Sequence, residues 1–321
     1  MILRIPVARL MVAGLFAAGL LLPARAPGDS GNVNWQDHFD RAGGFDSALA
    51  VVWAHGLIIV AGDTTKNAAG NRDWTVRAYE PHSGDLVWQD HFDRAGGFDR
   101  ALHATVEGKL LIVTGRTTNS TGNMDWTVRA YDARTGALRW QSHFDRAGGF
   151  DRATAATIAR DRLIVAGDST TAAGDFDWSV RAYHPRSGAL LWEDHFDRAG
   201  GDDRAYAVVE AKGIAVAAGH ATGPSGDTDW CLRAYNPHTG ALLWQDHFDR
   251  AGGGDGVWAA TAHGGVIIAA GHTASPFGGS DWSVRAHDAR TGALRWEDHF
   301  DRAGGDDRAQ AVAASGNRVF V

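Results

Sequence analysis

A repeat of 52 residues dominates this 321-residue sequence and limits the folds that it can adopt. The segment W-[QE]-[DS]-H-F-D-R-A-G-G begins at six tryptophans, 53 and then 52 residues apart: Trp35, Trp88, Trp140, Trp192, Trp244 and Trp296. A second marker, Asp-Trp, recurs every 52 residues from Trp74 to Trp282. This period is too long for a helical hairpin. It suits four short strands with their turns, the size of one β-propeller blade.

Turn residues divide one such unit, residues 101–144, into four strand-like segments. The predicted strands cover 101–107, 110–114, 126–131 and 138–144, with Gly and Asn between them. Gly and Asn supply the positive φ that tight turns need. No stretch after the N-terminal leader shows helical periodicity with caps. We therefore predict an all-β propeller of four-stranded blades with about six repeats, and seven or eight blades if the chain is truncated.

Residue size along the unit predicts which strand is innermost. The first strand is rich in Ala, as in residues 153–159, whereas the fourth strand carries Trp and Phe. Blades crowd together at the propeller axis and splay apart at the rim. Small residues inside and large residues outside fill that taper at normal packing density. The first strand should therefore line the axis and the fourth should lie at the rim.

The predicted domain organisation is a single propeller from residue 27 to residue 321. Five complete blades and one partial blade are expected at about 47–92, 101–144, 153–196, 205–248, 257–300 and 308–321. Residues 33–39 form an isolated fourth strand that is expected to latch the last blade. That blade then lacks its third strand and leaves unpaired edges, which are costly. We therefore expect the sequence to be a truncated version of a longer gene product.

The first 26 residues have the pattern of a secretory signal peptide. Arg4 and Arg9 precede an apolar run at 10–22, and Ala24-Arg25-Ala26 resembles a cleavage site. An uncleaved anchor is the alternative, but a run of 13 residues is shorter than the roughly 20 needed to span a bilayer. Loss of the leader changes the net charge from −7 to −10. We predict an exported, periplasmic or extracellular monomer without a membrane span, and nucleic acid is excluded as a partner.

The hairpin between the third and fourth strands has a sharper signature. Residues 130–140 and 286–296 both fit A-x-D-x-x-T-G-x-x-x-W, and the Ala, Gly and Trp positions hold in all five units. This motif resembles the tryptophan-docking motif of quinoprotein (PQQ-dependent) alcohol dehydrogenases. It is also similar to the PQQ-like repeats of non-enzymatic propellers. The resemblance implies that one Trp per blade stacks against the neighbouring blade: Trp88, Trp140, Trp192, Trp244 and Trp296.

The loop after each fourth strand repeats ionisable groups, such as His91, Asp93-Arg94 and Asp99-Arg100. A ring of carboxylates would suit Ca²⁺, which prefers oxygen ligands. Nearly every Asp is accompanied by an Arg, however, so bidentate Arg–Asp bridges between blades explain the pattern more simply. One His per blade lies too far from its equivalents for a zinc site. We assign no metal ligands and predict no cofactor, with neither PQQ nor Ca²⁺ expected.

Nothing in the sequence has the form of a catalytic motif. G-x-S-x-G, H-E-x-x-H and a phosphate-binding Gly-rich loop are all missing. The resemblance to the dehydrogenases implies an adjacent Cys pair, which the single Cys231 cannot supply. Near-identical repeats also place the same groups in every blade, whereas catalysis needs different groups around one point. We therefore assign no catalytic or cofactor-binding residue.

These observations favour a binding or structural scaffold. The alternative is a quinoprotein-like (PQQ/Ca-dependent) dehydrogenase, or another propeller enzyme, whose site residues lie outside this sequence. The expected partner, a protein or a small molecule, contacts the face formed by the loops after strands two and four. Four residues break the Ala-rich first strands and are candidates for contacts at the axial channel: Trp53, His103, Tyr206 and Trp258. The alternative for these four is that the inner strands tolerate larger side chains where the channel leaves space.

Overall fold

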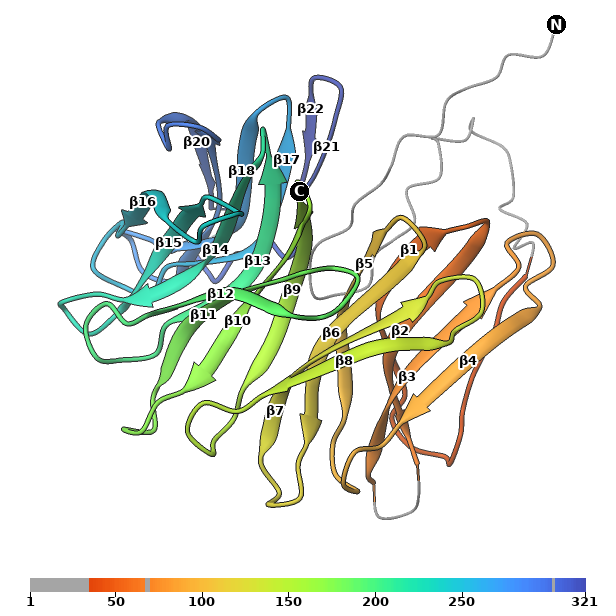
Figure 1. Ribbon diagram of the computed structural model, residues 1–321. Helices are drawn as coiled ribbons and strands as arrows, with labels where there is room; N and C mark the ends of the chain where they lie inside the picture. Colours follow the sequence, from red (N-terminus) through yellow and green to blue (C-terminus); the bar gives the residue numbers. More distant parts are fainter. Residues whose placement is uncertain (1–34, 67–69, 302–303) are drawn as a thin grey trace, which may run out of the picture.

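The computed structural model describes residues 35–66, 70–301 and 304–321, so the predicted signal peptide lies outside the described residues. Its 22 strands include five antiparallel four-stranded sheets, each with its strands in sequence order. We number these sheets as blades 1 to 5. The described part of the chain contains no helix that could cross a membrane. The predicted all-β propeller architecture is confirmed (Figure 1).

The blade boundaries follow the 52-residue period. Blade 1 is β1 (Ser47–Ala54), β2 (Leu57–Thr65), β3 (Arg72–Tyr79) and β4 (Leu86–Phe92). Blade 2 is β5 (Arg100–Glu107), β6 (Leu110–Thr118), β7 (Met124–Asp132) and β8 (Leu138–Phe144). Blade 3 is β9 (Arg152–Ala159), β10 (Arg162–Thr170), β11 (Phe176–Tyr183) and β12 (Leu190–Phe196). Blade 4 is β13 (Arg204–Ala211), β14 (Ile214–Thr222), β15 (Thr228–Tyr235) and β16 (Leu242–Phe248). Blade 5 is β17 (Gly256–His263), β18 (Val266–Ala274), β19 (Ser280–Asp288) and β20 (Leu294–Phe300).

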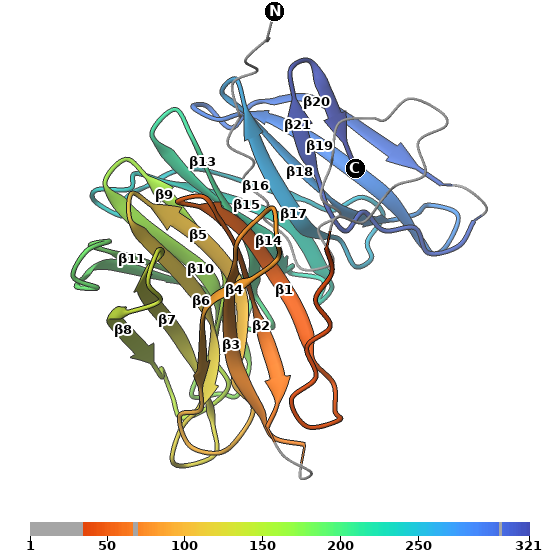
Figure 2. The same ribbon diagram turned by 90° about the vertical axis from the view of Figure 1, so that its right-hand side faces the viewer.

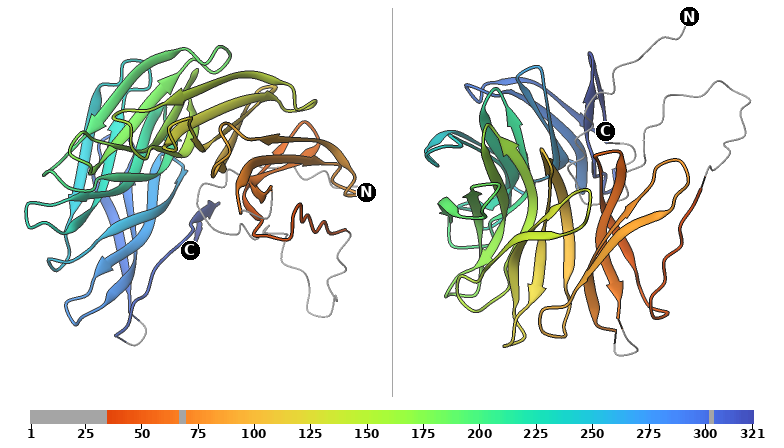
Figure 3. Two further views of the ribbon diagram at one scale, coloured as in Figure 1. Left: turned by 90° about the horizontal axis from the view of Figure 1, so that it is seen from below. Right: turned by 45° about the vertical axis from the view of Figure 1, so that its right-hand side comes forward.

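The five sheets follow one another around an arc (Figures 2 and 3). Their first strands are neighbours, since β1 contacts β5, β5 contacts β9, β9 contacts β13, and β13 contacts β17. The first strands therefore form the inner side of the arc. This is the order predicted from the gradient of side-chain size, because the small Ala side chains allow the inner strands to approach closely.

The core lies between consecutive sheets. The Asp-Trp tryptophan of blade 1, Trp74, is fully buried and clusters with Ala101, Leu111 and Val113 of blade 2. A Cβ on Gly115 would lie 2.0 Å from the Arg100 carbonyl and 2.9 Å from the Trp74 ring. This close approach explains why Gly recurs at the same place in each second strand.

One Trp of each fourth strand of blades 1 to 4 contacts the next blade. The Trp88 ring stacks on Tyr131 at 6.3 Å, and its Nε1 donates a hydrogen bond to the Ala133 carbonyl at 3.2 Å. The φ of Gly136 is +73°, and a Cβ there would lie 2.6 Å from Trp88. The same ring stacking joins four further pairs: Trp35–Tyr79, Trp140–Tyr183, Trp192–Tyr235 and Trp244–His287. Trp296 is 41% exposed.

A second layer of contacts lies beside each Trp. Arg129 of blade 2 covers the Phe92 ring of blade 1 at 3.7 Å, and Phe92 stacks on His143 at 6.2 Å. The carboxylate of Asp90 accepts hydrogen bonds from Arg129 Nη2 at 3.2 Å and from the Tyr131 hydroxyl at 2.9 Å. His143 Nδ1 bonds the Thr127 hydroxyl at 3.0 Å. The repeated W-x-D-H-F and V-R-A-Y segments thus meet across the blade boundary.

The two ends of the described chain differ from the predicted strands. Residues 35–39 form no strand, although Trp35 Nε1 donates to the Pro81 carbonyl at 2.8 Å and Phe39 stacks on His91. In the partial blade only β21 (Ala313–Ser315) and β22 (Arg318–Phe320) pair. The predicted first strand at 308–314 is therefore wrong for 308–312. Ala313 pairs with Phe320, and the antiparallel pairing extends over three residues on each side. The latch itself stays a prediction.

We expect Trp140→Ala to lower the free energy of unfolding by about 3 kcal/mol, because a large side chain between blades is removed. The substitution deletes the stacking on Tyr183 and the hydrogen bond to the Pro185 carbonyl. Trp296→Ala is the matched control at the equivalent position, and it should cost less than half as much. Urea unfolding measures both, and equal losses would argue against a role of these tryptophans in docking the blades.

Blade 2 lacks one carboxylate of the second layer. Ser142 stands where the other complete fourth strands carry Asp, so among the described residues the buried Tyr183 hydroxyl lacks the carboxylate acceptor that Tyr131 and Tyr235 have. Ser142→Asp should therefore stabilise the protein by about 1 kcal/mol by restoring a charged acceptor. Asp194→Ser should destabilise it by a similar amount, because Asp194 accepts from Tyr235 at 2.9 Å. Chemical denaturation of both variants tests this, and a destabilised Ser142→Asp protein would contradict it.

Candidate functional site

Each first strand carries a β-bulge near its start, and the bulges bring unlike side chains together. The register of β13 with β14 shifts between Ala205 and Ala207, which makes Tyr206 the extra residue. Trp258 has the same place in β17. A bulge turns a side chain away from the regular strand alternation. The opposing Gly219 allows this geometry, since a Cβ there would lie 2.0 Å from the Arg204 carbonyl.

In the second strand of each blade, the residue that follows the glycine equivalent to Gly219 differs between blades, although the surrounding sequence is nearly identical. It is Asp63, Arg116, Asp168, His220 and His272 in blades 1 to 5. Together with residues at the start of the neighbouring first strands it forms what we call the axial cluster. Its members are Asp63, Arg100, Arg116, Arg152, Asp168, Arg204, Tyr206, His220, Trp258 and His272.

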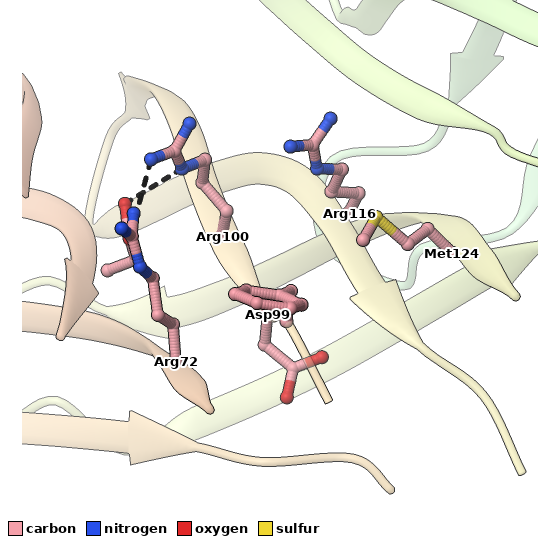
Figure 4. Close-up of a pocket in the computed structure, with 7 residues that line it drawn as sticks. Arg72, Asp99, Arg100, Arg116 and Met124 are labelled. Atoms are coloured by element: carbon pink, nitrogen blue, oxygen red, sulfur yellow. Dashed lines mark hydrogen bonds and ion pairs between the residues drawn. The ribbon is translucent and has the colours of Figure 1, made fainter. Parts of the chain in front are cut away.

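The cationic half of the axial cluster lines a pocket of about 240 Å³ (Figure 4). Asp63 is fully buried and accepts hydrogen bonds from Arg72 Nη1 at 2.9 Å and from Arg100 Nε at 2.8 Å. Arg116 has no ion-pair partner within the described ranges, and its guanidinium lies 4.8 Å from the Phe150 ring centre. Burial, together with the charges of Arg152 and Arg100, lowers the pKa of Arg116 to about 10. The pocket therefore contains a guanidinium that makes no direct ion pair within the described residues, although the nearby carboxylates of Asp168 and Asp63 partly offset its charge.

The other half of the axial cluster is aromatic and neutral. The Tyr206 ring lies 4.8 Å from Trp258 and 5.3 Å from His220. Trp258 Nε1 donates to His272 Nδ1 at 2.9 Å, so the proton of His272 sits on Nε2. Burial lowers the pKa of both His220 and His272 to about 4. Both imidazoles are therefore uncharged near pH 7, and they offer hydrogen bonds and flat surfaces instead of charge.

The structure separates the four axial candidates named from the sequence. Tyr206 and Trp258 are in contact. Trp53 is 60% exposed and lies at the far end of β1, next to the turn into β2. His103 is buried between blades, where its Nδ1 accepts a hydrogen bond from the Ala156 backbone N–H at 3.3 Å. Sequence reasoning missed Arg116, His220 and His272, although the variation after the repeated Gly was visible.

The repeated loop groups are tied into the framework. Arg94 Nη1 pairs with Asp125 of the next blade at 2.5 Å, and four equivalent pairs form: Arg41–Asp73, Arg146–Asp177, Arg198–Asp229 and Arg250–Asp281. Asp99 is buried and accepts hydrogen bonds from the backbone N–H groups of Arg94 and Thr118. Arg–Asp bridges between blades are therefore present, but each of these five runs through one carboxylate oxygen, so the predicted bidentate geometry is wrong for them.

The single cysteine has no features of a nucleophile. Cys231 is fully buried on β15, and burial raises the pKa of its thiol far above the usual range. A thiol attacks as the thiolate, so a raised pKa makes it inert. The axial cluster instead combines guanidinium, imidazole, carboxylate and aromatic groups, which can hold a ligand by charge and stacking.

Sequence comparison places this architecture among known proteins. A family model described as outer membrane protein assembly factor BamB matches residues 24–223, more than half of the chain. The chain belongs to this family of PQQ-like-repeat propellers. A search of the curated proteins finds no match.

Solved structures resemble this chain at low sequence identity, and the two with a TM-score of at least 0.50 share its fold. BamB from Moraxella catarrhalis is 16% identical to this chain, with a TM-score of 0.46. The match covers 78% of this chain and 63% of the BamB chain. The quinohemoprotein alcohol dehydrogenase ADHIIG from Pseudomonas putida HK5 is 13% identical, with a TM-score of 0.50. The match covers 79% of this chain and 42% of the dehydrogenase. The quinohemoprotein alcohol dehydrogenase from Comamonas testosteroni is 13% identical, with a TM-score of 0.52. The match covers 83% of this chain and 45% of the dehydrogenase. This chain thus spans less than two thirds of each of these structures.

Protonation of His103 should destabilise the fold in acid. Burial lowers the folded-state pKa of His103 to about 4, below the value near 6.5 of an unfolded chain. The unfolded state therefore binds more protons between these values, and stability falls as the pH drops through this window. Relative to His103→Gln, the wild type should lose about 3 kcal/mol between pH 7 and pH 4. Denaturant unfolding at both pH values tests this, and parallel pH profiles would contradict it.

Proposed function

We propose that this protein is an exported β-propeller that acts as a binding scaffold, with its partner on the face formed by the loops after strands two and four. One observation carries the proposal. The ionisable groups that repeat in every blade are engaged in contacts within the framework, whereas the groups that differ gather in the axial cluster. The pocket of this cluster is lined by Phe98 and Asp99 from the β4–β5 loop, so it opens on that face. Function in repeat folds resides in such departures from the repeat.

Exposed aromatic side chains on the same face favour a protein partner. Phe45 is 79% exposed and Phe277 is 91% exposed, and both lie in loops of this face. Large aromatic side chains supply much of the binding energy in protein interfaces. The matching family model describes an outer membrane protein assembly factor. This description supports export and an envelope protein as the partner.

Site-specific photo-crosslinking in the producing cells tests the proposed face. A photoreactive amino acid replaces Phe277 or Phe98 on the loop face, and Leu138 or Leu190 on the outer strands serves as the matched exposed control. We expect a discrete protein adduct from the loop-face positions and none from the outer strands. Adducts from the outer strands alone would overturn the proposed face, and a fully cytoplasmic protein would overturn export.

A quinoprotein-like dehydrogenase is the second candidate. The likeness to the quinohemoprotein dehydrogenases in fold and the pocket guanidinium of Arg116, which makes no direct ion pair within the described residues, favour it. The single, buried Cys231 counts against it. Incubation with PQQ and Ca²⁺, followed by gel filtration, absorbance and dye-linked alcohol oxidation, distinguishes the two candidates. Retained quinone absorbance with turnover would replace the scaffold proposal, whereas Ca²⁺ binding without quinone would not.

A further inference from the structure

Three aspartates meet where blade 3 joins blade 4. Asp177 comes from β11, Asp197 follows β12, and Asp203 precedes β13. Each can direct one carboxylate oxygen to within 4.8 Å of the other two. Asp177 is 4% exposed and Asp203 is fully buried, whereas Asp197 reaches solvent. Three negative charges are thus gathered at one blade junction.

The contacts of these carboxylates leave charge and one oxygen unsatisfied. Arg146 pairs with Asp177 Oδ2 and is the one cation within ion-pair distance of the three, as far as the described residues show. Asp203 accepts backbone hydrogen bonds from Thr222 at 2.7 Å and from Arg198 at 2.9 Å. Among the described residues, Asp177 Oδ1 is buried without a hydrogen-bond partner, as are the equivalent oxygens of Asp73, Asp229 and Asp281. A buried carboxylate oxygen without a partner is costly, so this oxygen points to a missing ligand.

The same place in blades 1 and 2 is supplied with a donor from the loop after the second strand. In blade 1, Lys66 Nζ pairs with Asp93. In blade 2, Asn119 Nδ2 donates to Asp125 Oδ1 at 2.7 Å. In blade 3 the equivalent Thr171 donates to Asp175 instead. A side chain of this loop thus supplies a donor beside the carboxylates in blades 1 and 2, but not in blade 3.

Blade 4 has a related group in which Asp229 and Asp249 are equivalent to Asp177 and Asp197, but Asp227 of the β14–β15 loop is the third member. Gly223 occupies the loop position of Lys66 and has no side chain. Asp229 Oδ1 is again buried without a hydrogen-bond partner, although Arg198 pairs with Oδ2. Asp227, Asp229 and Asp249 direct oxygens to within 4.8 Å of one another. Blade 1 has a similar aspartate group, Asp73–Asp93–Asp99, but there Lys66 supplies a positive charge. Within the described residues, the groups of blades 3 and 4 have no such lysine.

We propose that each of these two aspartate groups, Asp177–Asp197–Asp203 and Asp227–Asp229–Asp249, binds one Ca²⁺ ion that joins neighbouring blades. Ca²⁺ takes six to eight oxygen ligands at about 2.4 Å, so two ligands on opposite sides of the ion lie about 4.8 Å apart. Three carboxylates fit within this span, and water or backbone carbonyls complete the shell. The proposal departs from the sequence-based expectation that Arg–Asp bridges alone account for these loops.

Calcium titration of the full chain, after removal of metal with a chelator, tests the proposal. We expect two ions per chain by calorimetry and a higher Tm in Ca²⁺, since a ligand that binds only the folded state stabilises it. Asp197→Asn keeps an acceptor for the Gly200 N–H, now 2.6 Å from the carboxylate, but removes the charge. This variant should bind one ion, and Asp249→Asn, which likewise caps Gly252, should also bind one.

Asp145→Asn in blade 2 is the matched control, because Asp145 caps Gly148 in the same way and Asn119 supplies the donor there. This control should bind two ions. The double variant Asp197→Asn and Asp249→Asn should lose the Ca²⁺-dependent rise in Tm and bind about 100-fold more weakly. Terbium luminescence excited through tryptophan gives a second readout that does not depend on stability. Unchanged binding by the double variant, or no binding of Ca²⁺ up to about 1 mM, would overturn the proposal.

Discussion

Each blade junction depends on an arginine held between two blades. Arg129 lies over the Phe92 ring, donates to Asp90 of the preceding blade, and bonds Tyr131 and Gln141 of its own blade. A guanidinium can make all these contacts at once because it is flat and carries five donors. Its position fixes Tyr131, on which Trp88 stacks. The spacing of the sheets and the burial of the Trp74 layer therefore depend on this arginine and its equivalents.

This arrangement explains why a chain rich in ionisable residues has few free ones. In a repeat fold each unit contacts its neighbours, so stability is approximately a sum of units and junctions. A polar group that serves a junction must then recur with the period, as Arg94 and Asp125 do. A residue that serves no junction can change in a single blade. His220 and His272 stand where blade 1 has Asp63, and the bulge around them is unchanged.

The repeat sufficed to predict the blades, because strand length, turn position and the size gradient all recur in the sequence. It also led to Arg–Asp bridging, since each charge has an evident counterpart. The repeat did not reveal which of the residues that depart from it contact one another in the folded chain. Trp53, Tyr206 and Trp258 all break an Ala-rich strand, but the bulge reverses the alternation of side chains between Ala205 and Ala207. Trp53 lies beyond the bulge and Tyr206 lies within it. A one-residue shift in register decided the outcome, and periodicity does not report such shifts.

The charged side chains are not spread evenly over the blades as the repeat is. The chain carries a net charge of −7, yet Arg100, Arg116, Arg152 and Arg204 lie close together around Asp63 and Asp168. Carboxylates gather instead at blade junctions of the loop face, where Asp73, Asp177, Asp229 and Asp281 each keep an oxygen without a partner among the described residues. The face thus has a cationic centre surrounded by carboxylates. If cations neutralise the surrounding junctions, as we propose, the centre gains in positive potential, because the carboxylates that offset it are screened. Metal at the junctions and ligand at the axis would then be coupled through this field, without a change in the position of any strand.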